Sequence, residues 1–225
     1  MSTRTEEEQI LLIKSFFQHY GVKIIVALLV LLAAYVTYQY WQGSRVAAKE
    51  TASIYYNELL ILASEEKLSE NDRAKFDEAF ARLAKEYPST SYAAYAALQK
   101  AKLDVNANDL AAARQSLEWV RVNSKNTDIK ALATLRLARV ALSQGDHDQA
   151  LQLLSGNAGA FAALYEQAKG DVYLDQQKND QALLAYRKAR GLLDGVGSAT
   201  AQLLDIKIRS LDAGDQSKVF PKVAP

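Results

Sequence analysis

Residues 24–43, IIVALLVLLAAYVTYQYWQG, contain no charged side chain. A helix rises about 1.5 Å per residue, so roughly 20 apolar residues cross the hydrocarbon core of a bilayer. Aromatic side chains, which favour the membrane–water interface, lie at both ends of the run: Phe17 and Tyr20 precede it, and Tyr40 and Trp41 close it. The stretch therefore predicts a membrane-spanning helix.

A cleaved signal peptide is the main alternative to a permanent anchor. Signal peptides usually carry an apolar region of about 7–15 residues, followed by small residues at the cleavage site. Here the run is longer and aromatic residues occupy that place, so we expect residues 22–43 to remain as an uncut anchor. Flanking basic residues are nearly balanced, with Lys14 and Lys23 before the anchor and Arg45 and Lys49 after it. Flanking charge therefore leaves the orientation open.

The composition indicates a helical protein without nucleic-acid or thiol chemistry. The 225 residues carry a formal net charge of +1, which offers no electrostatic footprint for nucleic acid. The absence of cysteine excludes disulfides, thiolate catalysis and cysteine-ligated zinc. Because the chain has only three prolines and is rich in alanine and leucine, the expected fold class is all-α.

The anchor divides the chain into three expected parts. Residues 1–21 have apolar positions at three-and-four spacing, which indicates a short amphipathic helix that breaks at Gly21. Residues 44–225 form one soluble domain. Helical spacing resumes directly after Gly43, so the membrane span is expected to continue into this domain with little bend.

Capping and breaking residues mark the ends of further helices. Ser69 or Asn71 is expected to cap a helix that ends before Pro88, since proline disfavours helix at the residue preceding it. Near the C-terminus, Ser198 is expected to cap a final helix that closes the last apolar face of the domain. The tail from residue 214 to residue 225 is expected to be loose.

Between these helices the chain repeats itself at a spacing of thirty-odd residues. In each repeat a small residue is followed, across a polar turn, by alanine twelve positions later: Ala101 and Ala113, Ala138 and Ala150, and Gly170 and Ala182. A large side chain follows each second alanine by four positions: Leu117, Leu154 and Tyr186. Small residues let two helices approach closely, so the repeat predicts a solenoid of stacked helical hairpins.

The sequence carries no catalytic or metal-binding motif. Neither His19 nor His147 has a second ligand at metal spacing. Asp104 and Asp171 lie within expected helices, and we interpret them as solvent-facing residues rather than as an acid–base pair. We therefore expect no enzyme activity, no cofactor and no metal, and a function performed by the protein surface.

The repeats resemble the tetratricopeptide repeat, most clearly at Gly170, Tyr173, Ala182, Tyr186 and Ala189. The whole chain also resembles the single-pass ancillary subunits of the Sec translocon in Gram-negative inner membranes. The N-terminal EEEQ…IKSFFQHYG, the anchor that closes in YW and the repeat domain follow one another in the order of that family.

This resemblance implies a location and partners. It implies a bacterial inner-membrane protein with its N-terminus in the cytoplasm and its C-terminal domain in the periplasm. The implied partners are the Sec translocon, a membrane-anchored periplasmic chaperone of the prolyl-isomerase-like type, and exported client proteins.

The resemblance further implies a protein-binding groove, because the first helix of each tetratricopeptide unit lines a concave surface. The groove positions carried over are Tyr95, Leu98, Lys102 and Val105 in the first unit, Leu132, Leu135, Arg139 and Leu142 in the second, and Leu164, Gln167, Asp171 and Leu174 in the third. The leucines favour an apolar helix or an unfolded segment over a peptide's terminal carboxylate. The alternative is that some of them belong to the core between repeats.

Together these features predict a membrane-anchored protein-interaction module beside the Sec translocon that binds a periplasmic chaperone and assists exported proteins. Two alternatives stay open from the sequence. One is a membrane-anchored scaffold that associates with itself, and the other is a repeat receptor that faces the cytosol.

Overall fold

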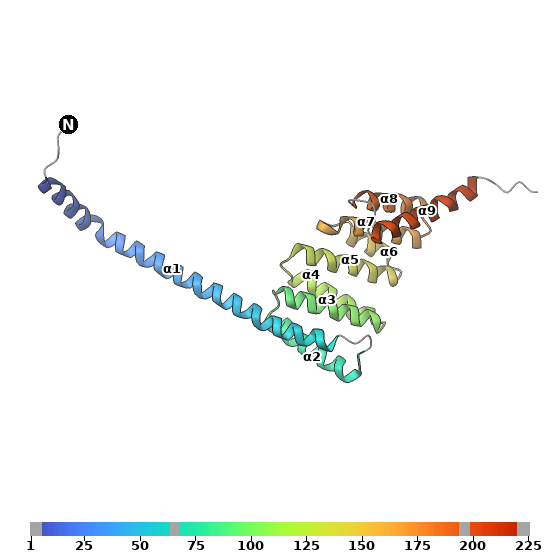
Figure 1. The fold of residues 1–225 in the computed structure, drawn as a ribbon, viewed down its shortest axis with the longest axis horizontal. Coiled ribbons are helices and arrows are strands. Elements are labelled where there is room, and N and C mark those ends of the chain that lie inside the picture. The colour runs from blue at the N-terminus through green and yellow to red at the C-terminus, as the bar shows by residue number, and fades with distance from the viewer. Residues whose placement is uncertain (1–5, 64–67, 194–198, 220–225) are drawn as a thin grey trace, which may run out of the picture. The chain divides into compact units, whose positions relative to one another are not determined.

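The computed structural model describes residues 6–63, 68–193 and 199–219, without the side chains of residues 6–13, 15, 17, 19 and 214–219. All regular structure in these ranges is helical (Figure 1). The expected all-α class, with one apolar helix followed by helical hairpins, is therefore confirmed. The expected cap at Ser198 and the end of the tail after residue 219 lie outside the described residues.

Helix α1 runs from Glu6 to Leu62 as one helix of 57 residues. The break expected at Gly21 is wrong, since the helix passes through it, whereas the expected continuation beyond Gly43 is confirmed. The part from Tyr20 to Leu62 contains an apolar window that is long enough to cross a membrane. None of the side chains in this window is buried. A helix satisfies its own backbone hydrogen bonds, as hydrocarbon requires, so α1 fits a single-pass anchor.

The chain divides into two compact units, with the boundary between Thr51 and Ala52. The second unit begins with the last turns of α1, which pack against helix α2 (Glu70–Glu86). Ser69 caps α2 through its side-chain oxygen, which accepts a hydrogen bond from the backbone N–H of Asp72 at 3.1 Å. This helix ends at its C-cap residue, the residue before Pro88, so both expected ends of α2 are confirmed.

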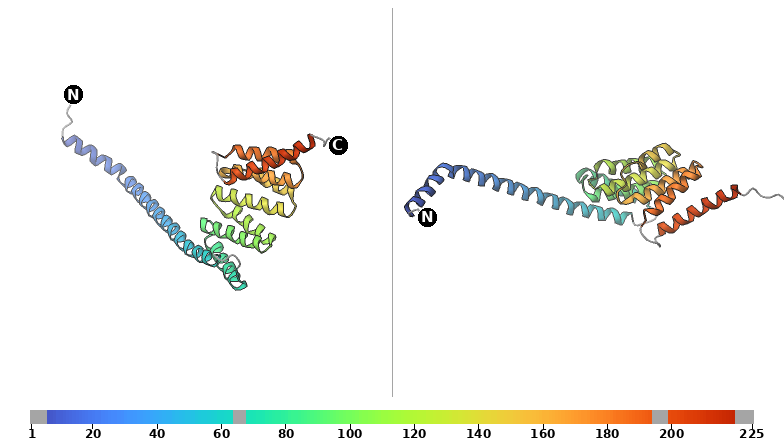
Figure 2. Two further views of the ribbon diagram at one scale, coloured as in Figure 1. Left: turned by 45° about the vertical axis from the view of Figure 1, so that its right-hand side comes forward. Right: turned by 90° about the horizontal axis from the view of Figure 1, so that it is seen from above.

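Stacked hairpins follow in chain order, and Figure 2 shows the same stack from two further directions. Their helices are α3 (Ser91–Asn106) with α4 (Leu110–Asn123), α5 (Thr127–Ser143) with α6 (His147–Leu154), and α7 (Ala162–Asp175) with α8 (Asn179–Gly191). A short 3₁₀ helix, η1 (Gly159–Phe161), precedes α7. Each small residue of the repeat is buried where the two helices of its hairpin meet, and so are Leu117, Leu154 and Tyr186. The predicted solenoid is confirmed.

The hairpins turn at equivalent positions, Asn108, Gly145 and Gln177, each with φ between 60° and 77°. Beyond each left-handed residue a backbone N–H returns to a carbonyl five residues earlier, as in Asp109 N to Asp104 O at 2.8 Å. This arrangement is the usual left-handed helix C-cap, which favours glycine. Of the three turn positions only 145 is a glycine. Asn108 and Gln177 adopt the same left-handed conformation at a higher energetic cost, because they carry a side chain.

One polar bond joins each first helix of a hairpin to the next first helix, and α9 (Ala199–Val219) continues the series. Arg136 on α5 donates to the carbonyl of Leu98 at 3.2 Å, and the Tyr165 hydroxyl on α7 donates to the carbonyl of Ala131 at 2.9 Å. Lys207 on α9 contacts Asp171 on α7. We call these three contacts the inter-repeat bonds.

Helix α9 covers the last hairpin. Its Ala201 and Leu204 are buried, and Leu204 packs with Ala182, Tyr186 and Ala189 of α8. The expected capping helix is therefore confirmed. It also reaches Val219, so the chain is helical for several residues beyond position 214, where looseness was expected.

Candidate functional site

The expected groove positions lie on α3, α5 and α7, but they do not share one accessible face. Leu98 and Leu135 are only 4% and 1% exposed, in the core between hairpins, and Gln167 is buried too. For these leucines the core interpretation holds. Two others, Leu142 and Leu164, are partly buried against the core of the second and third hairpins. Leu132 is likewise partly buried, against the core that α3, α4 and α5 form together.

The geometry of a helix explains why Leu98 and Leu135 are buried. At 3.6 residues per turn, a residue three positions on lies about 60° to one side, and a residue four positions on lies about 40° to the other. Leu98 lies three positions after Tyr95, and Leu135 lies three positions after Leu132. On both helices this side faces the neighbouring hairpin, so both leucines are buried. Consequently the accessible row on α5 passes through Leu132, Arg136, Arg139 and Ser143, which makes Arg136 a residue that the expected list missed.

The accessible row on α5 faces α3 across an open cavity of about 330 Å³, which we call the α3–α5 slot. Three expected residues line it: Lys102 and Val105 from α3, and Arg139 from α5. The remaining lining residues are Ala101, Asn106, Leu110, Leu117, Arg136, Val140 and Ser143. The slot thus has an apolar floor with basic and amide groups at its edge.

Two other expected groove positions, Tyr95 and Leu174, are exposed but do not line the slot. Tyr95 is 43% exposed on α3, and its ring lies 6.2 Å from that of Tyr56 in the last turns of α1. Leu174 is exposed near the end of α7. Leu142, Arg139 and Asp171 line a second cavity, between α5 and α7, whose volume is only about 10 Å³. This cavity is too small to hold a partner's side chain.

The electrostatics of the slot are one-sided. Arg136 is partly buried, and this burial, followed by the positive charge of Arg139, lowers the pKa of its guanidinium. Within the described chain, Lys102, Arg136 and Arg139 form no ion pair, and no acidic residue lines the slot. Two like charges therefore stand close together without a counter-ion.

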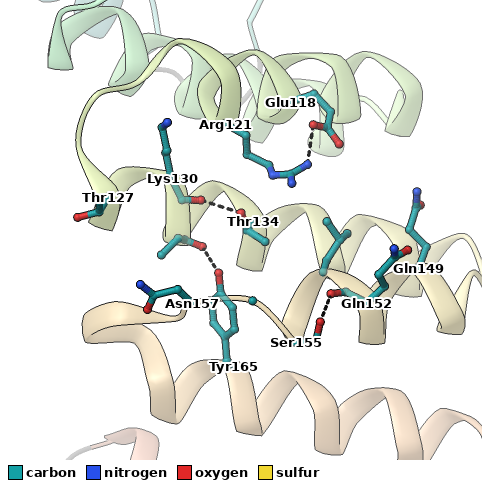
Figure 3. Close-up of a pocket in the computed structure, with 13 residues that line it drawn as sticks. Glu118, Arg121, Thr127, Lys130, Thr134, Gln149, Gln152, Ser155, Asn157 and Tyr165 are labelled. Atoms are coloured by element: carbon teal, nitrogen blue, oxygen red, sulfur yellow. Dashed lines mark hydrogen bonds and ion pairs between the residues drawn. The ribbon is translucent and has the colours of Figure 1, made fainter.

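A larger polar pocket of about 720 Å³ lies elsewhere, between α4, α5, α6 and the start of α7 (Figure 3). Its lining includes the ion pair of Arg121 with Glu118 at 2.7 Å, and Tyr165, whose hydroxyl donates to the Ala131 carbonyl. Gln149 lines it, and its buried Oε1 has no hydrogen-bond partner within the described part of the chain. Sequence reasoning missed this pocket because its residues come from four segments whose polar positions look like ordinary helix surface.

Both aspartates expected on solvent faces have structural partners, and for Asp104, which is buried, the interpretation is wrong, whereas Asp171 is partly exposed. Asp104 is 1% exposed and contacts Arg73 of α2, Lys100 at 3.2 Å and the Ser116 hydroxyl at 3.2 Å. Asp171 accepts a hydrogen bond from the Tyr186 hydroxyl at 2.7 Å and also contacts Lys207. The buried charge of Asp104 is balanced because cations from two helices reach it.

Metal-ligand geometry does not occur among the described residues, where no group of three or more His, Cys, Asp or Glu side chains lies together. The expected turn residue His147 is at the start of α6, and its ring nitrogen lies 2.6 Å from Asp175 of α7. The side chain of His19 lies outside the described residues.

Comparisons with known proteins cover the anchor and the repeats together. The family model described as a tetratricopeptide repeat-like domain matches residues 14–213. The ancillary SecYEG translocon subunit of Neisseria gonorrhoeae is 32% identical over 215 residues, which are 94% of this chain and 100% of that protein. Those of Escherichia coli and Aggregatibacter actinomycetemcomitans are 28% and 26% identical, over 92% and 93% of this chain and 96% and 98% of theirs. No solved structure matches the chain significantly.

Proposed function

Because this chain belongs to the tetratricopeptide-repeat-like family of ancillary SecYEG translocon subunits, we propose that it is a membrane-anchored interaction module that assists protein export beside the Sec translocon. The observation that carries this proposal is the extent of the match, which includes both the apolar helix and the repeats. A chain that shared only repeats would share only a binding fold.

We place residues 22–43 in the bacterial inner membrane, residues 1–21 in the cytoplasm and residues 44–225 in the periplasm. The length and apolar surface of α1 support the span. The orientation rests on the family resemblance, since the flanking basic residues are nearly balanced. A long domain after an anchor is translocated largely regardless of flanking charge, so this balance is compatible with a periplasmic domain.

The proposed partners are the Sec translocon, a membrane-anchored periplasmic chaperone of the prolyl-isomerase-like type, and exported proteins. Binding, not catalysis, is the proposed activity. Confinement to the same membrane raises the effective concentration of partners, so contacts that are weak in solution suffice. The exposed groove residues Tyr95, Lys102, Val105, Arg139 and Leu174 are the proposed contact surface.

Co-purification tests this proposal. The full chain is extracted in mild detergent, and recovery of SecYEG and of the chaperone is compared between the wild type and Leu174→Asp, a change at an exposed groove position. The matched control is Leu184→Asp, since Leu184 is 71% exposed on α8, away from the slot. Loss of the chaperone with Leu174→Asp alone supports the groove. Absence of SecYEG from the wild-type complex refutes the proposed function.

Two further outcomes decide the alternatives. Cross-linking in membranes that gives only copies of this chain favours the self-associating scaffold. Protease treatment of spheroplasts that leaves residues 44–225 intact, when a periplasmic marker is digested, refutes the periplasmic orientation and favours the cytosolic receptor.

A further inference from the structure

We propose that the α3–α5 slot binds a partner segment in which an apolar side chain is flanked by acidic side chains. This inference rests on the proposed function, because it specifies the chemistry of a partner for the same surface. It departs from the leucine-rich groove expected from the sequence, since Leu98 and Leu135 belong to the core and leave a basic surface in their place.

The first argument is the imbalance of charge. Three other basic side chains of this unit have acidic partners: Arg73 with Asp104, Lys188 with Glu166 at 3.0 Å, and Arg190 with Asp205 at 2.9 Å. At the slot, Lys102, Arg136 and Arg139 have no acidic partner among the residues that the structure describes. A chain of net charge +1 has thus gathered unbalanced positive charge at one cavity.

The second argument is that the basic groups are held in place. Arg136 is fixed by its hydrogen bond to the Leu98 carbonyl at 3.2 Å, so its guanidinium stays beside Arg139 instead of turning to solvent. Asp171 shares a small cavity with Arg139, but it is already bound by Tyr186 and Lys207. A carboxylate from outside would relieve the repulsion between the two arginines and gain charge-assisted hydrogen bonds.

The third argument is the floor of the slot. Leu117 and Val140 form part of the core, and Leu110 and Val105 extend the same apolar surface to the opening. The volume of about 330 Å³ is at the lower end of ligand pockets, which suits a side chain rather than a whole domain. An apolar side chain in the slot, with carboxylates at its edge, matches both parts of the lining.

The occupant that we propose is a protein segment and not a nucleic acid. An apolar floor offers nothing to a phosphate backbone, whose binding depends on an extended row of cations. A short stretch of polypeptide can place an apolar side chain on the floor of the slot and acidic side chains against its basic edge.

The test is a direct binding measurement with defined peptides. Fluorescein-labelled Gly-Glu-Asp-Leu-Phe-Glu-Asp-Gly is titrated with the full chain in detergent micelles, alongside two others. The first replaces the four acidic residues by lysine, and the second replaces Leu-Phe by Ser-Gly. The acidic apolar peptide is expected to bind at least about tenfold more tightly than either, and more weakly as salt is added.

Charge-reversal variants then locate the binding. Arg139→Glu and Lys102→Glu are each expected to weaken binding of the acidic peptide about tenfold and to strengthen binding of the lysine peptide. The control is Lys125→Glu, because Lys125 is an exposed residue in the turn after α4 and the change in net charge is the same. Far-UV circular dichroism confirms that the variants keep their helices.

The outcomes separate this inference from the proposed function. Equal binding of acidic and lysine peptides, absence of binding to all of them, or equal loss with Lys125→Glu overturns the slot assignment. Recovery of SecYEG is measured on the same preparations. If it persists while the peptides fail, only the chemistry of the slot is refuted.

Discussion

Gly170 is the position where a single added methyl group tests the packing most sharply. A Cβ there would lie 2.4 Å from Cε1 and 2.5 Å from Cδ1 of Tyr186. The ring of Tyr186 is fully buried, its hydroxyl is held by Asp171 at 2.7 Å, and Lys207 lies 5.0 Å from the ring centre. Since the ring cannot swing aside, the helices α7 and α8 must separate in Gly170→Ala.

The magnitude follows from two opposing effects. Overpacking of a core costs about 1–3 kcal/mol, and the fixed ring places this site near the upper end. Alanine is a better helix former than glycine by about 1 kcal/mol, which offsets part of the cost. We expect Gly170→Ala to lower the free energy of unfolding by about 2 kcal/mol.

Urea denaturation of the full chain in detergent, followed by far-UV circular dichroism, measures this change. The control is Gly191→Ala at the end of α8, where a Cβ meets nothing within 4 Å. In the background of Tyr186→Leu, which removes the ring, the cost of alanine at position 170 is expected to shrink by at least about 1 kcal/mol. A Gly170→Ala protein as stable as the wild type would refute the close approach of α7 and α8.

The remaining predictions concern buried polar and apolar groups and one turn. Asp104→Asn is expected to cost about 1–3 kcal/mol in urea denaturation, because it removes a buried carboxylate while Arg73 and Lys100 keep their ion pairs with Asp77; an unchanged free energy of unfolding contradicts a role for that charge in the fold. For Glu166, burial raises the pKa, but hydrogen bonds and charges from neighbouring lysines outweigh it and lower the pKa below its ordinary 4.5. Its stabilising contribution is therefore present above pH 4.5 and lost as the pH falls below that value. In Glu166→Gln the free energy of unfolding, measured by urea denaturation, should consequently fall less steeply with decreasing pH below 4.5 than in the wild type. Leu135→Asp should unfold the repeats in circular dichroism while Arg139→Asp leaves them folded, because Leu135 is buried and Arg139 is exposed, and equal effects would contradict the accessible row on α5. Gln177→Gly should raise the free energy of unfolding, measured by urea denaturation, by about 0.5–1 kcal/mol, since glycine adopts a positive φ without strain.

Local patterns predicted most of the fold. The uncharged run, the Ser69 cap and the stop before Pro88 each depend on a few neighbouring residues, and the structure confirms the helices that they define. The pairing of Gly170 with Ala182 depends on one hairpin, so it too was accessible from spacing. Gly21 failed as a break because a single glycine costs only about 1 kcal/mol in a helix otherwise continuous on both sides.

The candidate site was harder to predict because it depends on contacts between repeats. Whether Leu135 or Arg136 faces outward is a rotation of about 100° on one helix, and only the position of the neighbouring hairpin decides it. Asp104 looked like a surface residue because its cation on α2, Arg73, is 31 positions away. Long-range polar pairing of this kind leaves no periodic signal.

The inter-repeat bonds make each junction chemically different from the others. An arginine reaches a carbonyl at the first, a tyrosine hydroxyl does so at the second, and a lysine meets a carboxylate at the third. Backbone carbonyls are present in every hairpin, so the first two junctions could form again if hairpins exchanged places. The third could not, because Lys207 needs the carboxylate of Asp171, and α9 is therefore matched to the hairpin that it covers.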